Sequence, residues 1–504
     1  MNQLRVKSRL PALKALAIGA GVSCAILFPI LELAFGLHLY GDGSIFSYGV
    51  AVRDTWNIHW HNIPVRSFVY LYAIAPAETL VALSGNAQAG IALYALLLSS
   101  AQLAGLAITY FADRSERRTI FAFACASTAI LCPLVAGFPT EMWVAHAAYW
   151  PLLTLAIYAP ATMTGFAAVT LASFAVVFSH EGGIVMSLAI AALLAACGRR
   201  VLLWRFILAL ALAMSCWLAV KFLVVPEEYV GKVMSRAALN LLNPDLILRP
   251  VIVALLAALS FYALVLFLLR RFSGNADSNT FALFVCAAFA AACVGLAIYW
   301  LIFDRSLHSE GRYFLRTLLI VATPALGTCA GMLALGPAKQ SGRLAFAGRL
   351  MKFGQKSTAA TALAGAFALV LVVHAFETVK FTRAWKQYVR EVGALASASA
   401  SDPRFGDSRF VSAQRLSQHT KGLAWASTTP YLSILLSANQ RPAKLVIDPD
   451  TRFFWMSCER ARAQRQTGSA LPLPSLEMIE RYACLADRSW PSIGLTTQAS
   501  RAGN

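Results

Sequence analysis

The chain has 504 residues, of which 58% are apolar and only 13% are charged. Soluble domains carry about a quarter charged residues, so this composition excludes an ordinary soluble enzyme. The net charge of +19 does not indicate nucleic-acid binding. Much of the basic excess lies in short segments between apolar runs, where Lys and Arg hold loops on the cytoplasmic side. We therefore expect an all-α polytopic membrane protein, with membrane lipids and no nucleic acid among its partners.

The first predicted span covers residues 15–36. Four basic residues precede it, namely Arg5, Lys7, Arg9 and Lys14, and they place the N-terminus in the cytoplasm. Because the apolar run is long and lacks a clean small-residue cleavage site, we expect it to be retained rather than removed as a signal peptide.

Residues 66–84 form a second apolar stretch, which Pro76 and Glu78 interrupt. If this stretch crossed the membrane, the basic loops that follow, such as the one with Arg114 and Arg117, would fall outside. The positive-inside rule therefore predicts a helix that lies along the outer surface or re-enters from it. The later spans are then expected at 88–111, 119–137, 143–160, 162–178, 183–198, 202–224, 250–269, 279–302, 314–335 and 357–376.

Together these runs give about eleven spans, which form a transmembrane domain over residues 1–376. The odd count places the tail, residues 377–504, outside the cytoplasm, in the periplasm of a cell with an inner membrane. The only cysteines of the tail are Cys458 and Cys484, and they would suit a disulfide pair in an oxidising compartment.

The tail is polar enough to fold as a small extracytoplasmic α+β domain. It contains a helical pattern near 408–418 and a strand pattern over 444–448, Lys-Leu-Val-Ile-Asp.

Acidic and histidine residues gather in the loops that this topology places outside, whereas the inner loops are mostly short and basic. A catalytic cavity would therefore lie at the outer face. We single out Asp42, Tyr48 and Trp56 in the first outer loop (37–87), Glu141 in the second loop, His180 and Glu181 in the third, and Arg312 and Arg316 beside the fifth.

These residue types fit the transfer of a sugar from a lipid phosphate. The reaction needs a carboxylate that takes a proton from the acceptor hydroxyl, and cations, for which Arg is well shaped, that hold the departing phosphate. We expect Asp42 to be the base with Glu141 assisting, and Arg312 and Arg316 to bind the phosphate. Substrate-lining roles are predicted for His180, Glu181, Tyr48 and Trp56, since aromatic side chains suit sugar faces.

Each of these residues also has a structural interpretation, which the sequence leaves open. Asp42 is of a favoured N-cap type and would cap a helix that starts near Ser44. Glu141 would serve the first turn of the next span, and His180–Glu181 would belong to a tight outer turn with flanking glycines. Arg316 lies inside an apolar run and needs an anion, which is either a substrate phosphate or a structural partner.

The layout resembles the GT-C class of membrane glycosyltransferases, which use polyprenyl-phosphate-linked sugars. In that class the first outer loop follows the first span, bears an acid near its start and contains surface-lying helices, here expected at about 44–57 and 65–83. The second outer loop carries another acid. A soluble extracytoplasmic domain ends the chain in the oligosaccharyltransferases and in the aminoarabinose transferase of lipid A, and the protein mannosyltransferases belong to the same superfamily.

The resemblance implies a hexosyl- or pentosyltransferase that moves a sugar from a polyprenyl-phosphate donor to a lipid or glycan acceptor of the envelope. The reaction would take place at the outer face of the inner membrane. No tail motif of the Trp-Trp-Asp type is present, so we do not expect protein N-glycosylation.

Many members of the class have two adjacent acids in the first loop, whereas this chain has Gly41-Asp42-Gly43, a single acid. A single acid fits a mechanism with one base. No definite cofactor is predicted, although a divalent cation would fit the mechanism of members with two acids. His59 and His61 are more typical of an interfacial aromatic cluster than of a metal site, and no Cys-x-x-Cys or Cys/His spacing predicts one.

Two other functions remain open. A polysaccharide polymerase or ligase would use polyprenyl-pyrophosphate glycans and carry Arg and His in late outer loops, as the loops at 225–249 and 303–313 do. A transporter or flippase would place polar groups in the middle of the membrane, on broken helices. Here the spans are largely clean and the polar groups lie at one edge.

Overall fold

The computed structural model describes residues 9–58, 64–135, 141–224, 309–335, 357–397, 410–424, 428–437 and 444–447, with Arg462 and Gln466 in addition. In this part of the chain almost all regular structure is helical, and the strands are two segments of three residues each. Outside the described residues lie the expected spans 250–269 and 279–302, the histidines His59 and His61, and the cysteines Cys458 and Cys484.

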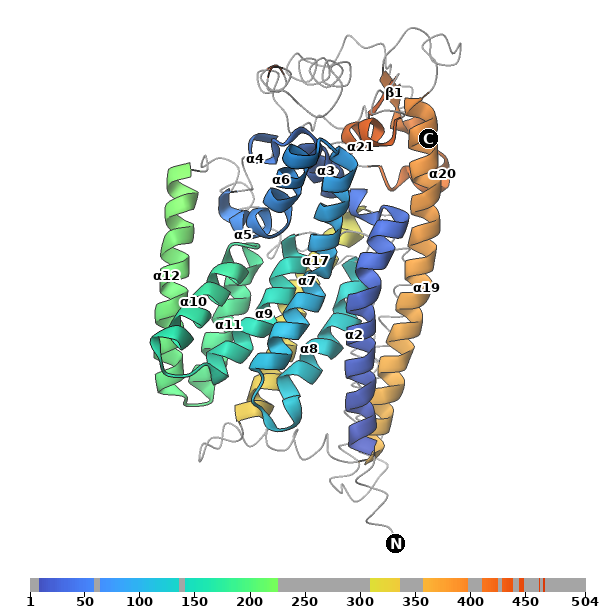
Figure 1. The fold of residues 1–504 in the computed structure, drawn as a ribbon. Coiled ribbons are helices and arrows are strands. Elements are labelled where there is room, and N and C mark those ends of the chain that lie inside the picture. Colours follow the sequence, from blue (N-terminus) through green and yellow to red (C-terminus); the bar gives the residue numbers. More distant parts are fainter. Residues whose placement is uncertain are drawn as a thin grey trace, which may run out of the picture.

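Long helices pack side by side in a bundle, with α12 and α19 at opposite sides of it in Figure 1. The contacts between helices far apart in sequence, such as α2 with α19 and α8 with α17, close the bundle. Its described helices are α2 (Arg9–Phe35), α7 (Ala87–Ala112), α8 (Thr119–Leu131), α9 (Glu141–Tyr158), α10 (Met163–Val177), α11 (Gly182–Ala196), α12 (Arg200–Val224), α17 (Ser309–Leu335) and α19 (Ser357–Ala396).

Four helical stretches are long and apolar enough to cross a membrane, namely Leu13–Phe35, Pro64–Ser84, Ala87–Ala112 and Arg200–Leu223. Large apolar side chains lie on their outer surfaces, for example Leu223, which is 84% exposed. An extended exposed apolar surface of this kind suits contact with lipid. The chain is therefore mostly helical and has the composition of a membrane protein, as expected.

The apolar runs locate the described helices well. The runs at 88–111 and 202–224, for example, correspond to α7 and α12 within two residues. One run gives only part of its helix, because 357–376 covers the first half of α19, which continues unbroken to Ala396.

The segment between α2 and α7 folds into short helices at one end of the bundle, the upper end in Figure 1. These include the regions expected to be helical at 44–57 and 65–83. Pro64–Ser84 is divided into helical pieces, and its Pro76 lies in the first turn of the last piece, where proline is tolerated. The pieces are η1 (Leu37–Leu39), α3 (Asp42–Val52), α4 (Thr55–Ile58), η2 (Pro64–Arg66), α5 (Ser67–Val69), a π-helical turn (Tyr70–Ile74) and α6 (Ala75–Ser84).

Glycines allow the helices of the bundle to approach one another closely. A Cβ atom at Gly105 of α7 would overlap the backbone of Ala147 in α9, and one at Gly21 of α2 would overlap the backbone of Cys125 in α8. Small residues at such crossings are what membrane helices use for close packing, since apolar side chains gain little by leaving lipid for another helix.

A buried polar network also joins α7, α8 and α9. His146 lies 2.9 Å through Nε2 from Ser127 Oγ and 3.0 Å through Nδ1 from Gln102 Oε1. The amide nitrogen of Gln102 donates to the carbonyl oxygen of Trp143 at 2.8 Å. This assignment makes Gln102 Oε1 an acceptor, so His146 donates from Nδ1 and accepts from the Ser127 hydroxyl. The network fixes the register of three helices.

The second half of α19 leaves the bundle and packs against the connection between α2 and α3. The indole nitrogen of Trp385 donates to the carbonyl oxygen of Phe35, the last residue of α2, at 3.0 Å. The ring of Tyr40 lies edge-on to both Phe381 and Trp385, with centroids 5.4 Å apart in each pair. A glycine with positive φ stands at each end of this connection, Gly36 (62°) and Gly41 (59°), where a side chain would be strained.

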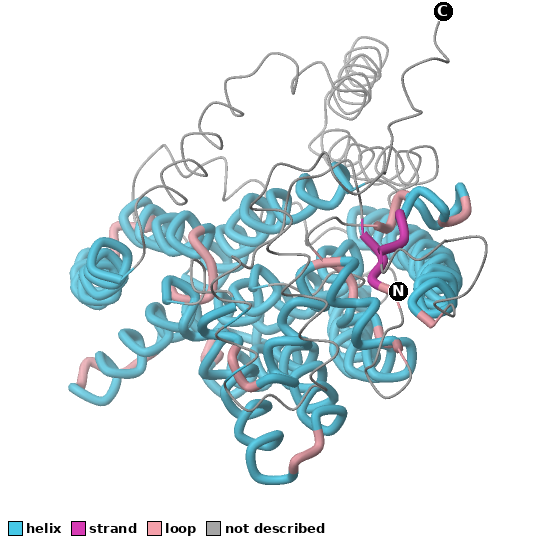
Figure 2. Tube along the Cα trace, turned by 90° about the horizontal axis from the view of Figure 1, so that it is seen from above, coloured by secondary structure: helices cyan, strands magenta, loops and turns pink. Residues whose placement is uncertain are grey.

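The described tail segments pack on α19 and α3 through α21 (Thr429–Leu436) and two parallel strands, β1 (Phe410–Ser412) and β2 (Leu445–Ile447). The strand expected at 444–448 is confirmed. The helix expected near 408–418 is wrong for residues 410–412, which form β1, and the helical part that follows is the short 3-10 helix η7 (Ala413–Arg415). Val411 and Val446 are paired across the strands and buried. Figure 2 shows both strands with helices on either side of them in the view from above.

We predict that Gly105→Ala lowers the free energy of unfolding by about 2 kcal/mol, because the added methyl group forces α7 away from α9. Thermal unfolding of the detergent-purified protein measures the change. The matched control is Gly19→Ala in α2, where an added Cβ has no atom within 4 Å and alanine favours the helix. A Gly105→Ala protein as stable as the control would contradict this account of the crossing.

Candidate functional site

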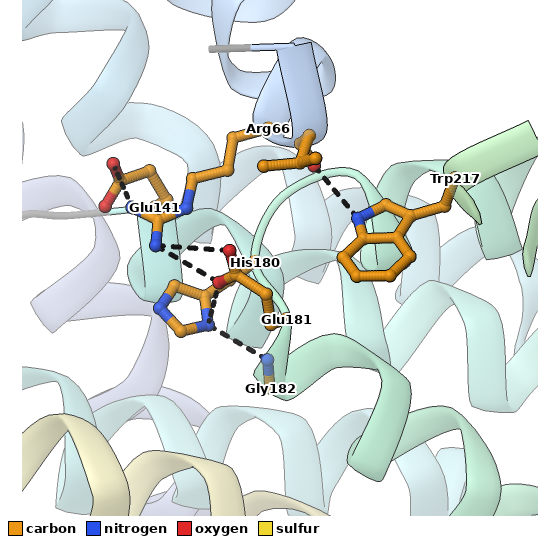
Figure 3. A network of polar contacts seen from close by, with 7 residues as sticks. Arg66, Glu141, His180, Glu181, Gly182 and Trp217 are labelled. Carbon is orange, nitrogen blue, oxygen red and sulfur yellow. Dashed lines mark hydrogen bonds and ion pairs between the residues drawn. The ribbon is translucent and has the colours of Figure 1, made fainter. Parts of the chain in front are cut away.

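Three segments of the chain meet at the end of the bundle that carries α3 to α6. One is the first loop, the second is the N-terminus of α9, which begins at Glu141, and the third is the turn between α10 and α11. Figure 3 shows how their charged side chains point toward one another. The meeting point lies where the acidic and histidine residues of the sequence are expected to gather.

Asp42 is the first residue of α3. The N-cap position belongs to Gly41, so the interpretation of Asp42 as the cap of a helix starting near Ser44 is wrong. Asp42 stands within the first turn, where the helix dipole favours a negative charge. The hydroxyl of Ser44 donates instead to the carbonyl oxygen of Leu39.

Asp42 and Glu141 line the same small cavity, which has room for about one water molecule. The structure thus brings together the two carboxylates that the sequence singles out, although 99 positions separate them (141 minus 42). The remaining wall is mostly apolar, and its one hydroxyl is that of a buried tyrosine. The other lining residues are Phe46, Val69, Ile74, Tyr94 and Leu98.

Arg66 lies in the first loop and joins it to the N-terminus of α9 and to the turn between α10 and α11 (Figure 3). Its Nη1 donates to Glu141 Oε1 at 2.9 Å, and its Nη2 lies 3.1 Å from Glu181 Oε2 and 3.4 Å from Oε1. The Arg66 side chain is 15% exposed, Glu141 is 4% exposed and Glu181 is 27% exposed. One guanidinium therefore serves two carboxylates in a largely buried place.

This arrangement keeps Glu181 ionised. Burial by itself would raise the pKa of Glu181, but the charges of Arg66 and the adjacent His180, with the hydrogen bonds to the carboxylate, outweigh it and lower the pKa to about 2. Such a shift follows when a cation and hydrogen bonds stabilise the charged form more than burial destabilises it.

His180 faces the network from the turn itself. Its Nδ1 accepts a hydrogen bond from the Gly182 backbone N–H at 2.9 Å and lies 3.4 Å from Glu181 Oε2. When the ring is neutral, this hydrogen bond places its proton on Nε2 and leaves Nδ1 as the acceptor. The contact with Glu181 becomes an ion pair only when the ring takes up a second proton.

Arg312 and Arg316 lie in the first two turns of α17, and their side chains are outside the described residues. The backbone shows at which end of the bundle these two residues lie. Ile320, one turn after Arg316, is the nearest neighbour of a Cβ built at Gly182, next to His180 and Glu181. The helix turns that carry both arginines are therefore at the end of the bundle where the network lies.

Tyr48 and Trp56, expected to line the substrate cavity, are not among the residues that line the cavity of Asp42. Tyr48 is fully buried and packs on Tyr431 of α21, with ring centroids 4.9 Å apart. Trp56 lies edge-on to Tyr70 at 5.2 Å. Tyr48 thus packs α3 against α21, and Trp56, which is 39% exposed, packs α4 against the π-helical turn that begins at Tyr70.

Arg66 was missed as a site residue in the sequence, as was Tyr94. A signal existed for Arg66, since it is a lone cation at the start of an apolar stretch, and a charge in such a place needs a partner. Glu78, in the same stretch, has a structural role. It accepts hydrogen bonds from the Thr55 backbone at 2.8 Å and from the Tyr70 hydroxyl at 3.0 Å, and so ties α6 to α4.

Within the described ranges, no group of three or more His, Cys, Asp and Glu side chains is arranged to hold a metal ion. Comparison with known proteins assigns no family, because no family model, curated protein or solved structure matches this chain. The function must therefore be argued from the site itself.

We predict that the melting temperature of the native protein falls more steeply than that of Glu181→Gln when the pH is lowered from about 5 to about 3. A lowered folded-state pKa stabilises the protein above the ordinary value near 4.5, and this stabilisation is lost as the pH falls toward 2. Thermal unfolding in nanodiscs measures the slope. Equal slopes for the native protein and Glu181→Gln would contradict the prediction.

Proposed function

We propose that this protein is an integral-membrane glycosyltransferase of GT-C type. It transfers a hexose or pentose from a polyprenyl-phosphate donor to a lipid or glycan acceptor of the cell envelope. The reaction takes place at the outer face of the inner membrane. The proposal is supported by the resemblance in layout and by the chemistry of the residues that meet at one end of the bundle.

The observation that carries the proposal is the cavity shared by Asp42 and Glu141. Asp42 takes the proton of the acceptor hydroxyl while the oxygen of that hydroxyl forms a bond to the anomeric carbon of the donor sugar. The bond between that carbon and the donor phosphate oxygen breaks, and the phosphate leaves with the bonding electrons. Glu141 assists by orienting the acceptor, and Arg312 and Arg316 bind the phosphate from the nearby turns of α17.

His180 and Glu181 are given a substrate-lining role beside the cavity, since Arg66 joins Glu181 to Glu141. Tyr48 and Trp56 are given packing roles in this proposal, because their rings lie against Tyr431 and Tyr70. A divalent cation is not required by the mechanism, since a single base and cationic side chains provide the necessary groups.

In the proposed topology about eleven helices cross the membrane over residues 1–376. The N-terminus is cytoplasmic, the short helices of the first loop lie at the outer surface, and residues 377–504 form a periplasmic domain. The positive-inside pattern of the loops supports this orientation.

We predict that Asp42→Asn lowers the amount of one envelope glycan by about 100-fold or more per inserted molecule, as expected for loss of a general base. Mass spectrometry of envelope lipids and glycans would compare cells lacking the protein with cells re-supplied with the native chain, Asp42→Asn or Asp54→Asn. The Asp54 variant is the matched control, because this acid of the same loop is not among the residues lining the cavity.

A glycan that the native chain and the control restore, and Asp42→Asn does not, would support the transferase and identify the sugar. Full restoration by Asp42→Asn would remove the base from the mechanism. If no glycan changed in cells lacking the protein, a transporter would replace the transferase.

The orientation can be tested by labelling introduced cysteines in intact cells with a membrane-impermeant maleimide. Cys458 and Cys484 are first replaced by Ser. We expect Ser84→Cys, before α7, to be labelled from outside and Arg114→Cys, after α7, to be protected. Both positions are exposed. The reverse pattern would make Pro64–Ser84 a span and place the tail in the cytoplasm.

A further inference from the structure

We propose that Arg66 is the positioning residue of this site. Its guanidinium holds Glu141 as a carboxylate in the cavity beside Asp42 and locks the first loop to the start of α9 and to the α10–α11 turn. The inference deepens the proposed function and rests on it for the role of the cavity, but the ion pairing itself can be tested without a transfer assay.

The backbone around Arg66 is held from two sides. The carbonyl oxygen of Val65 accepts a hydrogen bond from the indole nitrogen of Trp217 in α12 at 3.2 Å (Figure 3). The backbone N–H of Phe68 donates to the carbonyl oxygen of Phe178, after α10, at 3.2 Å. The guanidinium therefore leaves a fixed backbone and reaches two carboxylates on other elements, as a preorganised site requires.

The charge balance argues that Arg66 acts on Glu141 rather than on a substrate anion. Both terminal nitrogens of its fork already face carboxylates, so the two acids and one guanidinium carry a net negative charge. A phosphate would meet repulsion from both acids at this place. The donor phosphate is better served by Arg312 and Arg316 on α17.

This cation contacts Glu141 at 2.9 Å. The Glu141 side chain is 4% exposed and lines a cavity whose walls are mostly apolar. A buried carboxylate without a cation takes up a proton at neutral pH. A protonated Glu141 would be a hydrogen-bond donor to the acceptor hydroxyl and would no longer draw its proton toward Asp42.

Infrared spectroscopy of the full-length protein in nanodiscs tests the pairing directly. We expect Arg66→Gln at neutral pH to show a new C=O stretching band of a protonated carboxyl group, absent from the native protein and weaker or gone in Arg66→Gln/Glu141→Gln. The matched control is Arg205→Gln. Arg205 also uses both terminal nitrogens to hold a loop, through the carbonyl oxygens of Ala159 and Pro160 at the other end of the bundle.

The absence of a new band in Arg66→Gln, or an equal band when Glu141 is also replaced, would overturn the proposal. If Arg66→Gln fails to insert, Arg66→Lys takes its place. A lysine keeps the charge but has no fork with which to contact both acids, so we expect a weaker band of the same origin.

The glycan assay tests the consequence for transfer. We expect Arg66→Gln to lower the glycan by about 100-fold per inserted molecule, since displaced catalytic groups cost about this much, and Arg66→Lys to restore part of it. On spheroplasts the loss in Arg66→Gln should lessen as the external pH rises, because Glu141 then ionises without its cation. Arg205→Gln should keep the native glycan level at every pH.

The outcomes separate the two proposals. A carboxyl band in Arg66→Gln with full transfer by Asp42→Asn would retain the ion pair and overturn the proposed mechanism. Loss of transfer in Asp42→Asn with native transfer and no band in Arg66→Gln would retain the mechanism and overturn the role of Arg66. A loss of transfer in Arg66→Gln that does not vary with pH would also overturn it, because a purely structural defect behaves in that way.

Discussion

The sharing of one guanidinium between two carboxylates, one buried and one half-buried, is the constraint on which this end of the bundle depends. Glu141 and Glu181 come from different elements, and a nearby cation favours the ionised form of each carboxylate. Arg66 reaches both at hydrogen-bonding distance. The first loop, the start of α9 and the α10–α11 turn are therefore not free to move independently. A displacement of any one of them would leave a buried charge uncompensated.

The packing of the bundle provides the rigidity that this network needs. Gln102 of α7 donates to the carbonyl oxygen of Trp143, two residues after Glu141, and also contacts His146 one turn later. The position of Glu141 is thus fixed by the contacts of α7 with the residues that follow it in α9 and by its own ion pair with Arg66. At Gly105 the backbones of α7 and α9 approach so closely that a side chain would not fit. The geometry of the cavity follows from helix packing deep in the bundle.

The sequence allowed the helices and part of the site to be predicted, for a physical reason. A membrane helix is specified locally, by an apolar run of sufficient length, so α7 and α12 could be located without knowledge of their neighbours. The pairing of Arg66 with Glu141 and Glu181 spans 75 and 115 positions, and no local pattern records it. The tail segment at 408–418 was mistaken for a helix because its strand exists only through pairing with β2.

The connection that leads to Asp42 is bounded on its outer side by α19. Tyr40, two residues before Asp42, is fully buried between Phe381 and Trp385, and Trp385 also binds the last carbonyl of α2. The glycines at both ends of this connection fix where the chain turns, and the rings fix how far it extends. Because α19 is one continuous helix from the bundle to the tail, the same element that carries the tail also sets the place of the proposed base. The second half of α19 is therefore part of the geometry of the candidate site.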